Sequence, residues 1–159
     1  MKLAIITLAL TVSAFAAEPA HDHSKKQAGP SGGRLITEVE PHAEFFVNKD
    51  KKVEIRFVDE ANKVVAPAGQ TVSVVMGDRS APTKLTFAQD GDKLVSDGAI
   101  PEGDDYPAVV QIKVTPDAKT VTEKFNLNLS DCPECDYKEY ACICDHAEEA
   151  EGAAKKKAE

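Results

Sequence analysis

Short apolar runs separated by polar turns occupy the middle of the chain and favour β-strands. Between Arg34 and Ser130 nine such runs are rich in β-branched or aromatic residues and are bounded by Gly, Pro, Asn and Asp. The runs are residues 34–39, 43–47, 52–58, 63–66, 70–76, 84–88, 93–96, 108–114 and 120–129. No stretch in this range keeps a helical period over three turns. The pattern therefore predicts an all-β body over residues 34–130.

Alternation within several runs predicts which side chains face the core. Val53, Ile55 and Phe57 share one side of a strand, because side chains along a strand alternate between its two faces. The same period recurs in two later runs, at Val110, Ile112 and Val114 and at Phe125, Leu127 and Leu129. Eight or nine short strands in about a hundred residues are typical of a single antiparallel β-sandwich, immunoglobulin-like or Greek-key. A small barrel is the alternative.

The two ends of the chain differ from this body. Residues 1–16 start with Lys2, continue through an apolar run and end in Ala14-x-Ala16, which is the pattern of a secretory signal peptide cut after Ala16. The run is shorter than the ~20 residues of a spanning helix, so we expect a periplasmic or secreted protein with no stable membrane insertion. Residues 17–33 are predicted to form a flexible, His-containing lead-in, and residues 147–159 a disordered or frayed-helix tail.

The charge balance and the missing motifs narrow the function. The chain carries 27 acidic and 19 basic residues, for a formal net charge of −8. This balance argues against nucleic-acid binding and suits attraction of cations. Hydrolase, phosphate-loop and zinc-protease motifs are absent, and residues 43–131 contain no histidine to serve as a general base. We therefore expect no enzymatic activity.

Residues 43–131 contain neither cysteine nor histidine, so every cysteine and histidine lies outside this stretch. After the body the chain reads Cys132-x2-Cys135-x6-Cys142-x-Cys144-x-His146, within a Cys-rich segment at residues 131–146. A C-x2-C turn can direct two sulfurs at one ion, and an extended C-x-C places two more on one face. Four thiolates brought together in this way would select Zn(II) or Cu(I), with His146 as an auxiliary ligand.

Two other uses of these cysteines remain open. In an oxidising compartment an even number of cysteines commonly forms disulfides, which here would join Cys132 to Cys142 or Cys144 and Cys135 to the remaining cysteine. The protein would then be a disulfide-stapled structural or interaction module without enzymatic function. Redox exchange of the thioredoxin type is disfavoured because neither a helix start nor a βαβ pattern accompanies the C-x2-C pair.

A second candidate group of ligands lies in the lead-in. The motif His21-Asp22-His23 places two imidazoles beside a carboxylate, as short His-rich metal-binding tracts do. We therefore include His21 and His23 with the four cysteines and His146 as predicted metal ligands.

The segment Gly29-Pro30-Ser31-Gly32-Gly33-Arg34-Leu35 follows the His-containing lead-in and precedes the strand-rich region. It resembles the N-terminal β domain of periplasmic adaptor subunits of heavy-metal RND efflux pumps. The chain lacks the long helical hairpin and later barrel domains of those adaptors and adds the cysteine motif. The resemblance implies a stand-alone relative of that domain, or a short exported bacterial protein of another kind. It also implies handling of metal ions in the periplasm near an efflux system, with a metal efflux or other periplasmic protein as partner.

Overall fold

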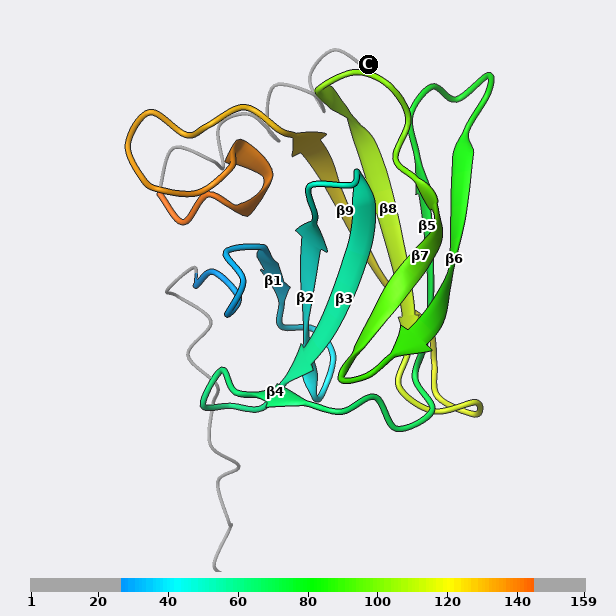
Figure 1. Cartoon of the computed structure of the whole chain (residues 1–159). Coiled ribbons are helices and arrows are strands. Elements are labelled where there is room, and N and C mark those ends of the chain that lie inside the picture. Colours follow the sequence, from blue (N-terminus) through cyan, green and yellow to red (C-terminus); the bar gives the residue numbers. More distant parts are fainter. Residues whose placement is uncertain (1–26, 145–159) are drawn as a thin grey trace, which may run out of the picture.

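The computed structural model describes residues 27–144, which form nine β-strands and one short 3-10 helix (Figure 1). Each of the nine predicted runs overlaps one strand. The strands are β1 (Arg34–Ile36), β2 (His42–Val47), β3 (Lys52–Val58), β4 (Val64–Val65), β5 (Thr71–Met76), β6 (Thr83–Asp90), β7 (Lys93–Ala99), β8 (Asp105–Lys113) and β9 (Val121–Asn128), and the 3-10 helix is η1 (Glu139–Ala141). Within this part of the chain no helix is long and apolar enough to cross a membrane.

The strands pair antiparallel in the order β1-β2-β3-β7-β6-β5-β8-β9, and β4 pairs with the end of β3. Strands β5, β6 and β7 follow one another as hairpins, and β8 returns to lie beside β5. This spatial arrangement, β8-β5-β6-β7, is the Greek-key order. The prediction of an all-β, antiparallel Greek-key fold is therefore confirmed.

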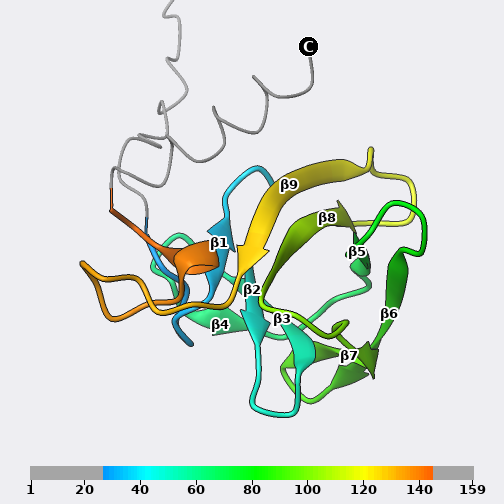
Figure 2. The same ribbon diagram turned by 90° about the horizontal axis from the view of Figure 1, so that it is seen from above.

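Strand β6 belongs to both halves of the fold. Its first half, Thr83–Thr86, pairs with β5, and its second half, Phe87–Asp90, pairs with β7. The sheet consequently curls around the core, and β1 and β9 meet at a seam, as the view from above shows (Figure 2). Side chains join the two seam strands: Arg34 pairs with Glu123 at 2.8 Å and lies 4.8 Å over the ring of Phe125. The fold is a sandwich whose sheets share a strand, intermediate between the two predicted architectures.

The core contains the residues that the alternation places inside. Val53, Ile55 and Phe57 are fully buried on β3. The later runs follow the same rule, since Val110, Ile112, Phe125 and Leu127 are buried and Val114 and Leu129 pack against the core. The apolar area removed from water, at about 25 cal/mol per Å², is the main stabilising contribution of these positions.

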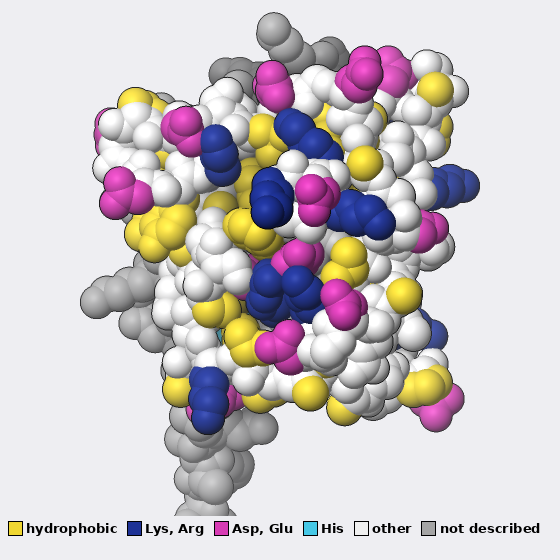
Figure 3. Space-filling model, in the orientation of Figure 1, with side chains coloured by type: hydrophobic (Ala, Val, Ile, Leu, Met, Phe, Trp, Pro, Cys, Tyr) yellow, Lys and Arg dark blue, Asp and Glu magenta, His cyan; other side chains and the backbone are white. Residues whose placement is uncertain are grey.

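The outer face of β3 carries a network of charged side chains rather than independent exposed ones. Glu54 accepts hydrogen bonds from Asn48 Nδ2 and Lys93 Nζ, both at 3.0 Å, and forms an ion pair with Arg56. Burial acts to raise the pKa of Glu54, but the bonds from Asn48 and Lys93 and the charge of Arg56 outweigh it and lower the pKa. Figure 3 shows basic and acidic side chains interspersed over β3 and β7.

The ordered body begins before Arg34, in a Gly-rich segment that was predicted to belong to the flexible lead-in. Ala28 bridges to Arg34, and the N–H groups of Ser31 and Gly33 donate to Glu44 Oε1 at 2.8 and 2.9 Å. Gly33 must be glycine here, since a Cβ would collide with the carbonyl oxygen of Phe45. The segment folds over the fully buried Glu44 side chain, which explains in physical terms why residues 29–33 are rich in glycine.

Candidate metal centre

The segment after β9, residues 131–144, forms a compact loop that we call the cysteine loop. Asp131 bridges to Lys138, and the Cys132 N–H donates to the Tyr137 carbonyl at 2.9 Å, so the C-x2-C motif lies within a closed turn. The Glu139 N–H donates to the Ser130 carbonyl at 2.9 Å, which brings η1 back towards the end of β9. Helix η1 contacts both β9 and β1, and the loop therefore covers one end of the seam.

Tyr140 fixes the cysteine loop to the β-rich body. Its side chain is buried, and its hydroxyl accepts a hydrogen bond from the Val47 N–H at 3.2 Å. Its ring packs edge-on against Phe45 at a centroid distance of 5.9 Å and stacks on Phe125 at 6.5 Å. Burial raises the pKa of Tyr140, so its hydroxyl stays neutral at physiological pH. A local motif of four cysteines is thereby joined to the core through an aromatic cluster drawn from β2 and β9.

The loop brings all four cysteine sulfurs together. The Sγ atoms of Cys132, Cys135, Cys142 and Cys144 lie within 4.8 Å of one another. The separations from Cys142 Sγ are 3.3 Å to Cys132 Sγ and 3.8 Å to Cys135 Sγ. Four sulfurs about 2.3 Å from a tetrahedral zinc ion would lie about 3.8 Å apart. The cluster therefore has the dimensions of a tetrathiolate metal site.

None of the four cysteines forms a disulfide. The Cys132 and Cys142 sulfurs lie 3.3 Å apart, well beyond the about 2.05 Å of a disulfide bond. The loop consequently presents four thiols or thiolates as potential ligands.

Backbone amides favour the thiolate form of the first cysteine pair, Cys132 and Cys135. The Glu134 N–H, assisted by the Cys135 N–H, donates to the Cys132 sulfur and lowers its pKa against the effect of burial. The Tyr137 N–H likewise lowers the pKa of Cys135, again against the effect of burial. Amide hydrogen bonds to sulfur also reduce the charge density that a metal–thiolate cluster must carry.

The second cysteine pair, Cys142 and Cys144, behaves in the opposite way. Burial raises the pKa of Cys142, although the Cys144 N–H donates to its sulfur at 3.3 Å. The hydrogen bond between the Cys142 and Cys144 thiols raises the pKa of Cys144. Without a metal ion, the arrangement keeps protons on the second pair while the first pair gives its protons up more readily. Binding of a cation would displace all of these protons.

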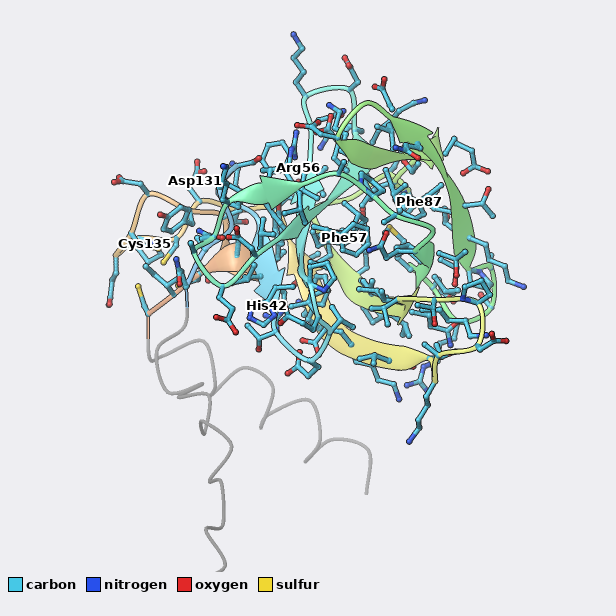
Figure 4. All side chains as sticks on the ribbon, turned by 90° about the horizontal axis from the view of Figure 1, so that it is seen from below. His42, Arg56, Phe57, Phe87, Asp131 and Cys135 are labelled. Carbon is cyan, nitrogen blue, oxygen red and sulfur yellow. The ribbon has the colours of Figure 1, made fainter. Side chains whose placement is uncertain are left out.

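The predicted ligands divide into two groups. The four predicted cysteines lie together, whereas His21, His23 and His146 fall outside the described residues. His42 starts β2 and directs its Nδ1 to the Val39 carbonyl oxygen at 2.8 Å. Figure 4 shows Cys135 on the loop outside the ring of strands, and Phe57 inside that ring.

Neither Tyr140 nor Glu44 is among the residues predicted from the sequence for this site. Tyr140 is one of two aromatic residues in the cysteine loop, with Tyr137, and lies two positions before Cys142, which was a usable signal of an anchor. Glu44 gave no such signal, because its alternation within the second apolar run places it on the outer face. The Gly-rich segment and the cysteine loop also contact each other, since a Cβ on Gly32 would lie 3.4 Å from the Tyr137 ring.

Comparisons with protein-family models, with curated protein sequences and with solved structures gave no match. The class of site is therefore defined by its own geometry: four clustered cysteines at metal-binding distance on an antiparallel β fold.

Proposed function

We propose that this protein is an exported, non-enzymatic metal-binding accessory that captures one d10 metal ion, Zn(II) or Cu(I), through the cysteine loop. The observation that carries the proposal is the grouping of Cys132, Cys135, Cys142 and Cys144, whose sulfurs lie within 4.8 Å of one another. Thiolates select soft and borderline ions, and a tetrahedron of four is the usual structural zinc site. Export, and a metal efflux or other periplasmic protein as partner, rest on residues 1–16 and on the resemblance of residues 29–35.

Charge favours Zn(II) over Cu(I) at this site. The cysteine loop contains four carboxylates and a single lysine, Lys138, which is paired with Asp131 at 2.6 Å. Four thiolates leave a net charge of about −2 around Zn(II) and about −3 around Cu(I), and the more negative complex is more strongly repelled by the nearby carboxylates. The acidic surroundings also attract a free divalent cation during its approach.

Metal analysis of the full chain tests the proposal. Protein purified under reducing conditions should bind one Zn(II) per chain, and Co(II) in its place should give the absorption of a tetrahedral thiolate complex. A variant with all four cysteines replaced by serine is the matched control and should lose this zinc ion. A wild-type chain that binds no more zinc than this control would refute the proposal.

The disulfide-stapled module is the competing function, favoured by the 3.3 Å approach of Cys132 and Cys142 sulfurs. The intact mass of protein taken from its native compartment distinguishes the two functions, because each disulfide removes about two hydrogens. A metal-free chain with two disulfides would support the module and exclude the metal-binding accessory.

A further inference from the structure

The cluster is covered unevenly, and this determines from which side an ion can be reached. The side chains of Cys132 and Cys142 are buried, at 6% and 7% exposure, whereas Cys135 and Cys144 are only half-buried. The buried pair adjoins the body in the chain, since Cys132 comes four residues after the end of β9 and Cys142 directly follows η1, which contacts β9 and β1. An ion held by the four sulfurs would therefore be shielded on the side of the body and open on the side of Cys135 and Cys144.

An exposed apolar residue adjoins the two more exposed cysteines, because Ile143 precedes Cys144 and its N–H donates to the Cys135 sulfur. Ile143 lies between the two cysteines of the second pair and is 37% exposed. Within residues 27–144 it is the one exposed large hydrophobic residue. A single exposed apolar residue is ordinary on a protein surface, but its position next to two accessible sulfurs makes it a candidate contact.

Carboxylates surround this open side. Asp131, Glu134 and Asp136 are exposed on the cysteine loop, and Glu139 is partly exposed. Figure 3 shows acidic side chains around the loop, at the upper left, above a group of hydrophobic atoms. Figure 4 places Asp131 and Cys135 together on this outer part of the molecule. The four carboxylates of the loop outnumber its single lysine, which pairs with Asp131. A metal tetrathiolate adds negative charge of its own, so this side carries a net negative charge and complements a basic surface.

From these features, and resting on the proposed function, we infer that the metal ion enters and leaves between Cys135 and Cys144. The same side, defined by Cys135, Asp136, Ile143 and Cys144, docks an acceptor that presents thiols within a basic surface. An acceptor thiol loses its proton and bonds to the ion, while the bond from the ion to Cys144 Sγ breaks and that sulfur takes up a proton. Exchange at Cys135 follows in the same way. No atom is oxidised, and the two buried cysteines release the ion last.

Limited alkylation tests the route of exchange. The zinc-loaded full chain is treated with substoichiometric iodoacetamide, so that no chain is modified twice, and the modified cysteine is located by peptide mass analysis. We expect Cys135 and Cys144 to carry most of the label. Equal labelling of all four cysteines, or preferential labelling of Cys132 and Cys142, would overturn the assigned route.

Transfer to synthetic acceptors tests the docking surface. Two peptides with one C-x2-C motif each, flanked by four lysines or by four glutamates, serve as zinc acceptors in stopped-flow measurements. At low salt the lysine peptide should accept zinc at least ~10-fold faster, and high salt should reduce the difference, because steering by charge is screened. Asp136→Asn should reduce the preference, whereas Asp117→Asn, an exposed aspartate outside the cysteine loop, should not. Equal rates with both peptides would overturn the docking surface.

The results of these experiments distinguish failure of the proposed function from failure of the proposed route and docking surface. A chain that holds no zinc refutes the proposed function. A chain that holds one zinc ion, yet shows uniform alkylation and no preference between the peptides, refutes this inference alone.

Discussion

Substitution of Tyr140 tests whether the metal site depends on its attachment to the β-rich body. The ring is 4% exposed and packs on Phe45 and Phe125, and its hydroxyl accepts the Val47 N–H at 3.2 Å. Tyr140→Phe removes only the hydrogen bond, for a cost of about 1 kcal/mol. Tyr140→Ala removes the ring as well, and truncation of a buried aromatic side chain costs about 3–5 kcal/mol.

The expected effect of these substitutions on the affinity for zinc follows from the coupling between docking of the loop and binding of the ion. If only the docked loop holds the ion well, the apparent dissociation constant rises as the docked fraction falls. At 1.4 kcal/mol per tenfold change, about 1 kcal/mol weakens zinc binding by at most about fivefold in Tyr140→Phe, and about 3–5 kcal/mol by at most ~100-fold to ~4,000-fold in Tyr140→Ala. Competition with a chromophoric chelator measures the affinity, and urea unfolding with and without zinc measures the stability.

A matched control separates docking from general destabilisation. Met76 is 2% exposed on β5, a strand that the path of hydrogen-bonded strands places away from the seam. Met76→Ala should lower the free energy of unfolding by about 2–5 kcal/mol and leave the zinc affinity of the folded protein unchanged. If Tyr140→Ala binds zinc as tightly as the wild type, the coupling between docking and metal binding is refuted.

Three further substitutions examine the body. Glu54→Gln should lower the free energy of unfolding at neutral pH and flatten its pH dependence below pH 4.5. The reason is that the lowered pKa of Glu54 gives stability that is present above this pH and lost on acidification. Urea midpoints equal to those of the wild type from pH 3 to 7, about the range of carboxylate titration, would contradict this. Burial, with the charge of Asp104, raises the pKa of Tyr106 from 10.0 to about 12, so its contribution is complete below pH 10 and lost as the pH rises towards 12. Tyr106→Phe should remove that alkaline loss in unfolding measurements, and an identical loss in both proteins would exclude the assignment. Gly33→Ala should cost about 1–3 kcal/mol through collision with the Phe45 carbonyl, whereas Gly98→Ala, whose Cβ would contact Leu85 at 3.4 Å, should change little in the same thermal melts.

The strands could be predicted because their signal is local. Alternation such as Val53, Ile55 and Phe57 identifies a core face without knowledge of the neighbouring strand. The curl of the sheet could not be predicted in this way, because it depends on β6 changing partners within one strand and on long-range contacts such as Arg34 with Glu123. Strand order and closure are set by packing between distant segments, which periodicity does not encode.

For the candidate site as well, the local part could be predicted and the long-range part could not. The cysteines lie within one short segment, so their spacing alone indicated that one turn could bring them together. The support for that segment comes from β2 and β9, far away in sequence, through Phe45, Val47 and Phe125. Glu44 illustrates the remaining difficulty, since its burial arises from the Gly-rich segment that covers it and not from its own strand.

The shared strand β6 has a consequence for how the molecule comes apart. Since its two halves bond to β5 and to β7, neither side of the fold has a complete set of hydrogen-bonded neighbours without the other. The described body should therefore melt as one cooperative unit, with its most protected amides exchanging together on global opening. A fragment cut within β6 would leave two pieces with open edges, each prone to pair with other chains.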